Sequence, residues 1–363
     1  MLKKAAALML ACASMGAWLG CGSTKSRFLY ASIPSSSTIV AYREDPNAGV
    51  LTQLAGSPIT AGSAVQALAI HPSGKFLYTA NSGSNNISLY TISSTGGLTE
   101  VTPRVPAGTA PMQMAIDQAG SFLYVANSGS ADISVYTIDS SKGTLTPVQQ
   151  THGATAPIGI SALNMALAPS GSVLYVTLAG GSGLNPPGFV EVFPVSQGVL
   201  GSPVAGSPFQ TGSNPYGLAI NSAGTALYTA NKTDGTISEF TINSDGSLTE
   251  LSGSPIGETY TGPVSLLIDK SGKYLYVANQ GSSNVAAYSI GSDGGLTLLS
   301  NSPFSTGSQP SILSSDSSGK YVFVGNQSTS VIQSFTLDAS TGALTSVASY
   351  SISATPTSIV ITP

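Results

Sequence analysis

Side chains that could act as a general acid or base are scarce for a chain of 363 residues, with 16 acidic residues and 2 histidines. Histidine, the side chain that exchanges protons most readily near neutral pH, occurs twice, at positions 71 and 152. His152 lies in a polar segment and could take a proton from an attacking water; a solvated loop histidine is the alternative. Glu258 is a second candidate base, and Arg104 and Lys232 are cations that could stabilise an oxyanion. These four residues are the candidates for hydrolytic catalysis.

A second group of polar side chains carries no charge. Their amides and hydroxyls suit hydrogen bonds to sugar hydroxyls or to the backbone of a protein partner. The group consists of Gln66, Gln113, Asn164, Tyr216, Tyr260 and Gln309. We therefore expect these six residues to bind a ligand.

Several common reaction and cofactor motifs do not occur. The sequence contains no Gly-x-Ser-x-Gly, no Gly-x-Gly-x-x-Gly, no phosphate-binding lysine loop and no histidine pair at metal spacing. Beyond residue 26, arginine occurs only at positions 27, 43 and 104. Phosphorylated substrates usually need arginine or lysine at their site. We expect no metal and no cofactor, and the few arginines argue against a phosphosugar.

The overall charge excludes further classes of partner. Charged residues make up 8% of the 363-residue chain, against about 25% in an average globular protein. The formal net charge is −4, without a basic patch or polybasic run. Nucleic acid is therefore not expected as a partner, and an attraction to anionic lipid is not expected either.

The first residues indicate export. Lys3 and Lys4 precede an apolar stretch that is short for a transmembrane helix. The segment 20–23 (GCGS) resembles a bacterial lipoprotein cleavage site, although Trp18 and Leu19 depart from the usual motif; an ordinary signal peptide is the alternative. We expect a signal peptide at 1–20, a lipid-attachment Cys21 with a tether to residue 26, and an exported domain at 27–363. Its location would be the bacterial cell envelope, as an outer-membrane or periplasmic lipoprotein, or the medium after secretion, with the N-terminal lipid as its only membrane contact.

One short phrase returns seven times, about 48 residues apart, and this repeat predicts the architecture. The phrase combines aromatic and β-branched residues, as in Phe76-Leu77-Tyr78-Thr79-Ala80-Asn81. Its copies begin at Phe28, Phe76, Phe122, Val173, Ala226, Tyr274 and Tyr321. A period of this length, built from short strands, is typical of β-propellers. The sequence thus predicts an all-β, seven-bladed β-propeller.

Each repeat has room for four antiparallel strands. In the second repeat these are expected at 65–70, 75–80, 86–92 and 98–102, separated by polar or glycine-rich turns. The first repeat starts at Arg27 without an inner strand, and residues 357–363 form an inner strand without a blade. We expect the C-terminal strand to complete the N-terminal blade and close the ring, which removes an open sheet edge.

The repeats resemble those of the lactonase or 6-phosphogluconolactonase-like family of seven-bladed propellers, with YVTN-type repeats. The likeness is carried by phrases such as those at 72–81, 271–279 and 318–326 and covers the chain after residue 26. The resemblance implies hydrolysis of a sugar lactone at the mouth of the central channel, with His, Arg and Glu side chains. A mark of that family is a histidine just after a proline at the start of an inner strand. Here this slot holds Gln66, Met112, Leu163, Tyr216, Val264, Ser311 and Thr357.

The candidates share one face of the expected ring. Loops before the inner strands and loops between second and third strands lie at the same end of the channel, where ligands usually bind. All candidates named above are expected in or beside these loops, as are Asp132, Asp234 and the irregular insertion 180–188. The insertion is either a recognition loop or a tolerated surface insertion. His71 belongs to the opposite face, in a turn slot that elsewhere holds Asp or Asn, and is expected to be structural.

Three functions follow from these observations. The first is a binding or scaffold module for a small neutral ligand, a glycan or an envelope protein, favoured by the uncharged polar residues. The second is a lactone hydrolase, implied by the family resemblance. The third is a purely structural assembly module. Whether the protein is an enzyme is open at this point, because fold alone does not determine function.

Overall fold

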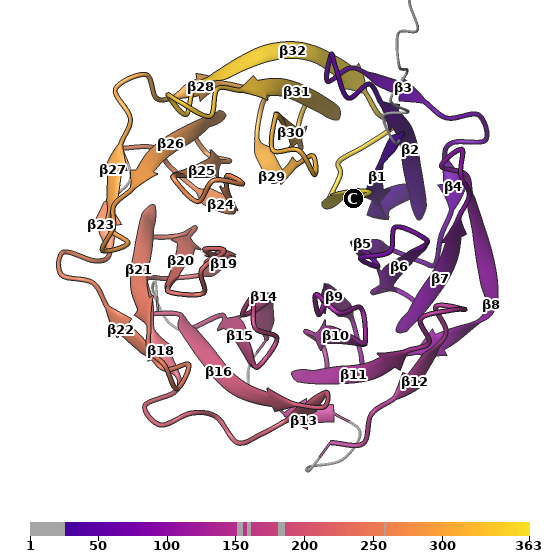
Figure 1. Cartoon of the computed structure of the whole chain (residues 1–363), viewed down its shortest axis with the longest axis horizontal. Helices are drawn as coiled ribbons and strands as arrows, with labels where there is room; N and C mark the ends of the chain where they lie inside the picture. The colour runs from indigo at the N-terminus through magenta and orange to yellow at the C-terminus, as the bar shows by residue number, and fades with distance from the viewer. Residues whose placement is uncertain (1–25, 151–154, 158–160, 181–185, 258) are drawn as a thin grey trace, which may run out of the picture.

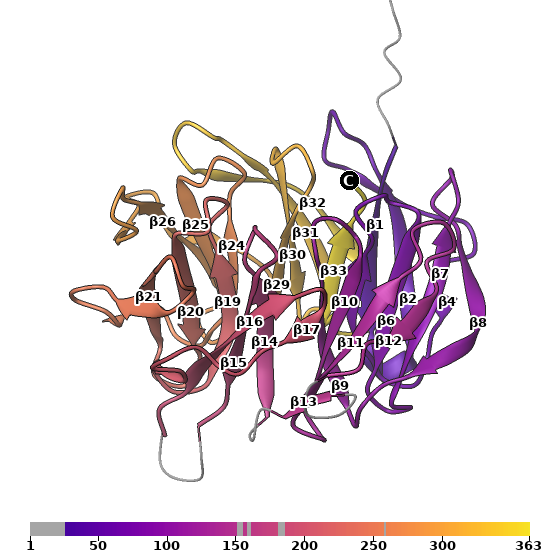
Figure 2. The same ribbon diagram turned by 60° about the horizontal axis from the view of Figure 1, so that its bottom comes forward.

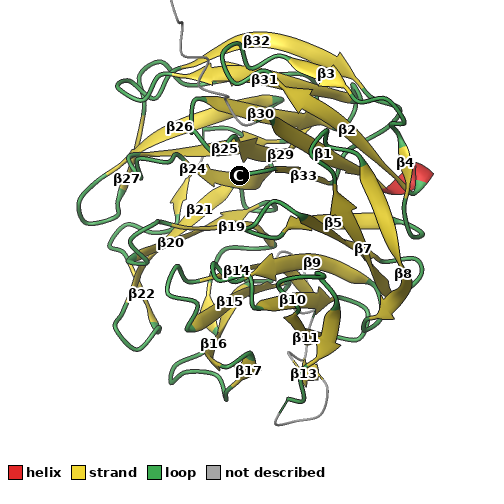
Figure 3. Ribbon diagram, turned by 45° about the vertical axis from the view of Figure 1, so that its right-hand side comes forward, coloured by secondary structure: helices red, strands yellow, loops and turns green. Residues whose placement is uncertain are grey.

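The second strand of each repeat forms because its aromatic and β-branched residues can be buried on both faces of a sheet. In the computed structural model, which describes residues 26–150, 155–157, 161–180, 186–257 and 259–363, seven sheets surround a central channel (Figure 1). The described chain consists of strands and loops, with one short helical turn, η1 (Pro34–Ser36) (Figure 3). No described helix is long and apolar enough to span a bilayer.

Seven inner strands line the channel. They are β5 (Val65–Ile70), β9 (Pro111–Ile116), β14 (Ala162–Leu167), β19 (Pro215–Ile220), β24 (Pro263–Ile268), β29 (Pro310–Ser315) and β33 (Ser358–Ile361). The second strands carry the repeated phrase and are β1 (Arg27–Ile33), β6 (Phe76–Asn81), β10 (Phe122–Asn127), β15 (Val173–Leu178), β20 (Ala226–Asn231), β25 (Tyr274–Asn279) and β30 (Tyr321–Asn326). Every pairing within the sheets is antiparallel, as predicted.

The third strands are β2 (Thr38–Glu44), β7 (Asn86–Ile92), β11 (Asp132–Ile138), β16 (Phe189–Ser196), β21 (Thr236–Ile242), β26 (Asn284–Ile290) and β31 (Val331–Leu337). Two blades have one continuous outer strand, β8 (Leu98–Pro106) and β32 (Leu344–Ser351). The other five split it into two short strands that pair with the same third strand. The first pieces are β3 (Leu51–Gln53), β12 (Leu145–Pro147), β17 (Val199–Leu200), β22 (Leu248–Glu250) and β27 (Leu296–Leu298). The second pieces are β4 (Ile59–Thr60), β13 (Thr155–Pro157), β18 (Phe209–Gln210), β23 (Ile256–Gly257) and β28 (Phe304–Ser305).

Adjacent blades pack on one another through buried tyrosines. Each hydrophobic cluster combines side chains from two neighbouring blades, for example Tyr78 and Ile87 with Leu123 and Tyr136. The tyrosine of the repeated phrase also donates its hydroxyl to a glycine carbonyl in the outer turn of the next blade. This bond occurs in Tyr30–Gly96, Tyr78–Gly143, Tyr175–Gly246, Tyr228–Gly294 and Tyr276–Gly342, at 2.7 to 3.0 Å. The repeat therefore encodes both the sheet and its connection to the next sheet.

The asparagine that ends most second strands is a structural residue, as its regular return predicts. Asn81 is fully buried, and its amide nitrogen donates to Asn86 Oδ1 at 2.9 Å and Ser88 Oγ at 3.1 Å. The same bonds hold the loop after the second strand in other blades, as between Asn127 and Ser134 at 2.9 Å. These asparagines fix the loops that surround the channel mouth.

The ring closes as predicted. β33 pairs antiparallel with β1, with Ser358 opposite Ser32 and Ile361 opposite Leu29. Because inner strands begin at the mouth, this antiparallel register puts the start of β1 and the end of β33 at the opposite face, as Figure 2 also shows. The start of β1 and the channel mouth therefore lie on opposite faces of the disc.

His71 lies in the turn between β5 and β6, where the sequence places it. It is 5% exposed, and its Nε2 is 2.9 Å from the carbonyl oxygen of Gly120 in the next blade. Its Nδ1 is 2.8 Å from Ser73 Oγ. In the same slot Asp269 accepts hydrogen bonds from the backbone N–H groups of Lys273 and Tyr274. Residues at this position therefore stabilise the turn between the first and second strands, and His71 also contacts the next blade.

Candidate functional site

A β-bulge at the start of six of the seven inner strands turns one side chain of each of these strands toward the channel. In β5 the pairing with β6 shifts between Val65 and Ala67, so that Gln66 is the extra residue. The same shift occurs around Met112, Leu163, Tyr216, Val264 and Ser311. Bulges commonly redirect side chains beside functional sites. The slot that sequence alignment of the repeats identified is therefore the bulge position.

The bulged residues form the wall of a cavity of about 430 Å³ at the channel mouth. The wall also includes the first residue after four of the second strands, namely Ser128, Lys232, Gln280 and Gln327. The backbone N–H of each of these four residues donates to a carbonyl just before an inner strand, as in Lys232 N to Asn214 O at 2.9 Å. Thr355, Pro356 and Thr357 complete the wall beside β33.

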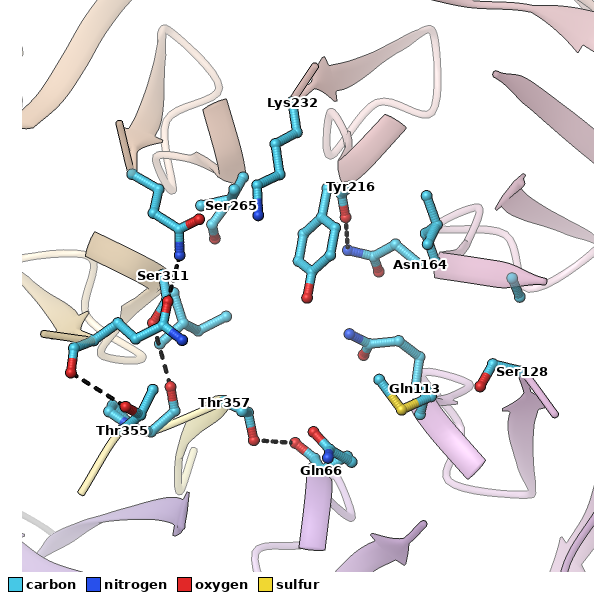
Figure 4. A pocket seen from close by; sticks show the side chains of 18 of the residues that line it. Gln66, Gln113, Ser128, Asn164, Tyr216, Lys232, Ser265, Ser311, Thr355 and Thr357 are labelled. Atoms are coloured by element: carbon cyan, nitrogen blue, oxygen red, sulfur yellow. Dashed lines mark hydrogen bonds between the residues drawn. The ribbon is translucent and has the colours of Figure 1, made fainter. Parts of the chain in front are cut away.

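The two sides of the cavity wall differ in how their side-chain amides are hydrogen-bonded (Figure 4). On the side of β25 and β30, Gln280 Nε2 donates to Gln327 Oε1 at 2.5 Å, so each of these two amides uses one of its polar groups on the other. On the other side Asn164 Nδ2 donates to the backbone oxygen of Tyr216 at 3.1 Å. The side-chain amides of Gln66 and Gln113 form no hydrogen bond with other described residues and face the cavity (Figure 4). The second side therefore offers groups for a ligand.

Lys232 and Tyr216 form the chemically most distinctive contact of the wall. The Lys232 Nζ atom lies 5.2 Å from the centroid of the Tyr216 ring, within the range of a cation–π interaction. Tyr216 is 39% exposed, which is unusual for a large aromatic side chain of this protein, and its hydroxyl points into the cavity (Figure 4). Among the described residues of the wall, Lys232 is the only one with a charge, and none is a carboxylate or a histidine.

The structure brings together most of the predicted ligand-binding residues. Gln66, Gln113, Asn164, Tyr216 and the predicted cation Lys232 all line the cavity. Sequence reasoning missed Ser128, Gln280 and Gln327. A signal for them exists, because each directly follows the repeated asparagine.

Three predicted residues lie elsewhere. Tyr260 packs against the cluster formed by Tyr228 and Leu275, and Gln309 is exposed, with its Oε1 atom 2.7 Å from Ser328 Oγ. The predicted loop location of Arg104 is wrong, because β8 continues through this residue to Pro106. Its guanidinium donates to Glu100 at 2.7 Å on the outer strand, away from the cavity.

Some predictions fall on parts of the chain that are not described. His152, Glu258 and Cys21 lie outside the described residues, as does 181–185 within the insertion. Asp132 accepts from the Asn127 amide at 2.7 Å, and Asp234 accepts from the backbone N–H of Ser213 at 2.5 Å. Asp234 borders a separate recess with Glu250 and Pro187, rather than the channel mouth. The described residues contain no cluster of three or more potential metal ligands.

Comparisons with known proteins agree with this architecture. A family model described as "Lactonase, 7-bladed beta-propeller" matches residues 23–162 and 189–361. A comparison with curated protein sequences finds no match. The unmatched segment 163–188 includes β15. This strand is the second strand of its blade and ends at Leu178, where most second strands end in asparagine.

Solved structures with the same fold include several whose names refer to lactonases. A Bacteroides fragilis protein described as a candidate 6-phosphogluconolactonase is 21% identical, covering 94% of this chain and 99% of its own, with a TM-score of 0.79. The periplasmic gluconolactonase PpgL of Pseudomonas aeruginosa is 19% identical, covering 93% and 99%, with a TM-score of 0.72. At these identities the likeness shows the fold.

Proposed function

Because the chain belongs to the seven-bladed β-propeller lactonase family, we propose that its channel mouth binds a sugar lactone and promotes hydrolysis of the ring. The observation that carries this proposal is the cavity wall itself. In the described part of the wall, amides and hydroxyls, together with apolar side chains such as Met112, Leu163 and Val264, surround a single ammonium group and a single exposed aromatic ring. A volume of about 430 Å³ lies in the usual range of small-molecule sites.

The free polar groups of the wall match a polyhydroxylated ligand. The side-chain amides of Gln66 and Gln113 can each donate and accept hydrogen bonds, as can the Tyr216 hydroxyl. A sugar hydroxyl both donates and accepts as well. The amides come from two different blades, and backbone hydrogen bonds from Ser82 N to Ala64 O and from Ser128 N to Ala110 O hold the start of each inner strand before a ligand arrives.

The wall also contains a group suited to the reaction. In lactone hydrolysis the oxygen of water bonds to the carbonyl carbon, the bond from that carbon to the ring oxygen breaks, and the ring oxygen takes up a proton released by the water. Negative charge gathers on the carbonyl oxygen during the attack. The Lys232 ammonium stabilises this charge, and the Gln113 amide oxygen orients the water by accepting a hydrogen bond. Catalysis then rests on electrostatic stabilisation and orientation.

The test is the rate of glucono-1,5-lactone opening, followed by acid release at constant pH and corrected for the spontaneous reaction. We expect the protein to accelerate opening, and Lys232→Gln to lose roughly 100-fold in kcat/KM, the usual effect of removing one oxyanion donor. Lys320→Gln is the matched control, because Lys320 also lies over a tyrosine ring, at 5.1 Å, but does not line the cavity. Equal rates for the protein and for buffer would rule out the hydrolase.

One observation favours a second function, binding without catalysis. The described cavity wall offers neither a carboxylate nor a histidine as general base. A neutral glycan, or the backbone of an envelope protein, would still find the amides and hydroxyls it needs. A glycan and peptidoglycan binding panel run on the same preparation separates the two functions. Binding without ring opening supports the module, and ring opening supports the enzyme.

A further inference from the structure

We propose that the channel mouth selects sugar monoacids, which combine several hydroxyls with one carboxylate, and that Lys232 receives the carboxylate. The inference rests on the proposed function, because opening a sugar lactone yields such an acid in the same cavity. It goes further in naming the charge of the preferred ligand and in setting non-phosphorylated acids apart from phosphorylated ones.

The first argument is the electrostatic isolation of Lys232. The ion pairs of the described chain involve Arg27 and Arg104, both away from the cavity, and Lys232 has no carboxylate partner among the described residues. The nearest acid in sequence, Asp234, accepts a hydrogen bond from Ser213 N and borders the separate recess. A half-buried ammonium that has no counterion among the described residues favours an anionic ligand.

The second argument is the number of cations. The described cavity wall holds one positive charge, which matches one carboxylate. A phosphorylated sugar acid carries up to two further negative charges, and phosphate sites usually gather several charged donors. Other lysines lie on the opposite face of the disc. An example is Lys270, whose Nζ donates a hydrogen bond to the Ser317 carbonyl at 2.8 Å. They cannot supply the missing charge at the mouth.

The third argument is the position of the ammonium relative to the other free groups. Lys232 lies above the Tyr216 ring, and Asn164 holds the Tyr216 backbone in place. The Tyr216 hydroxyl and the Gln113 amide point into the same space (Figure 4). A carboxylate on Lys232 therefore leaves the hydroxyl-bearing chain of a sugar acid against Tyr216 and Gln113.

The experiment is calorimetric titration of the protein with gluconate, glucitol and 6-phosphogluconate at low and high NaCl. Gluconate and glucitol differ only in the carboxylate. We expect gluconate to bind about ten-fold tighter than glucitol, as one charge-assisted contact allows, and salt to weaken this preference. Lys232→Gln should remove the preference, Lys320→Gln should keep it, and 6-phosphogluconate should bind no tighter than gluconate. Unchanged melting temperatures show that both variants are folded.

The inference is overturned if gluconate and glucitol bind equally, if the preference persists in Lys232→Gln, or if 6-phosphogluconate binds ten-fold tighter than gluconate. Its failure is distinguishable from failure of the proposed function. Lactone opening without a carboxylate preference removes the inference alone. A Lys232-dependent preference for gluconate without lactone opening removes the proposed hydrolysis and supports the inference.

Discussion

Glu44 is a buried carboxyl group at the seam where the first and last blades meet. It is 1% exposed, and neither of its oxygens has a hydrogen-bond partner in the described structure. The nearest cation, Arg27, is 3.6 Å from Glu44 Oε1 but 2.6 Å from Asp316 Oδ2 in the last blade. One guanidinium thus faces two buried carboxyls, which favours a proton on one of them.

The pKa of Glu44 is raised to about 7, mainly by burial and also by the charge of Asp316, while the charge of Arg27 opposes the shift. The folded protein then keeps a proton that the unfolded chain loses above its ordinary pKa of 4.5. Stability should therefore decrease as pH rises from about 4.5 to about 7. In Glu44→Gln this part of the decrease should disappear, and melting temperatures across this pH range test it.

The control for this prediction is Glu250→Gln, because Glu250 is exposed and should leave the slope unchanged. A remaining slope is expected in both variants, since burial also raises the pKa of Glu191, to about 7, and that of Glu239. If the pH slope of Glu44→Gln equals that of the wild type, Glu44 does not hold the proton.

Individual site residues were predictable where the repeat supplied a register. Counting from the repeated phrase places Gln66 and Tyr216 at equivalent positions, and the bulge turns both into the cavity. Arg104 was misplaced because no local pattern shows that the outer strand of its blade continues where five others are split. Pairing between the amides of Gln280 and Gln327, which come from different blades, also has no sequence signal.

At the scale of elements, a tyrosine–glycine hydrogen bond accompanies the hydrophobic contact at five of the seven junctions between blades. Tyr228 is fully buried in β20, and its hydroxyl is 2.7 Å from the carbonyl oxygen of Gly294, beyond β26. The glycine adopts a φ of 91°, a conformation that disfavours other residues. This geometry recurs in five of the seven blades, where it ties the second strand to the outer turn of the next blade.

Removing one such hydroxyl should weaken the ring measurably. Tyr228→Phe leaves the Gly294 carbonyl without its partner and should lower the free energy of unfolding by about 1–3 kcal/mol. Chemical denaturation provides the measurement. In Tyr124→Phe the loss should be smaller, because the corresponding carbonyl, that of Gly198, accepts from Gln150 Nε2 at 3.2 Å. Equal losses in both variants would contradict this account.

Most strands were predictable because their residues alternate or are buried throughout, as in 65–70 and 86–92. The split outer strands were not. A stretch such as 54–58 makes a turn between two short pieces, and both pieces pair with the same third strand, β2. Each piece is only two or three residues long, and the alternation of apolar and polar residues cannot be recognised over so short a segment.

At the scale of the whole molecule, the seam between the last and first blades differs from the other junctions. Phe323 occupies the tyrosine position there and has no hydroxyl to donate. The seam instead has the Arg27–Asp316 ion pair and a hydrogen bond of 2.8 Å from Leu51 N to the Tyr350 hydroxyl. In addition, β33, which follows the last blade in the chain, joins the sheet of the first blade by pairing with β1. The chain ends thus contribute the contacts that the repeat does not supply at this junction.

The sequence of the leader predicts how the whole domain is attached. If Cys21 carries a lipid, the protein should be found in the membrane fraction of its host, and Cys21→Ser should move it to the soluble fraction. Cell fractionation with labelled fatty acid incorporation tests this directly. A wild-type protein that is soluble and unlabelled would favour the ordinary signal peptide instead.

The start of β1 at the face opposite the mouth would determine how a lipid-anchored protein faces the membrane. Five residues separate Cys21 from Arg27, so the spacer can reach roughly 20 Å at most. The bilayer would then lie next to the face where β1 starts, and the cavity at the other face would open toward water, away from the bilayer. Dissolved sugars could reach it without passing lipid headgroups, and neighbouring macromolecules would meet its rim first.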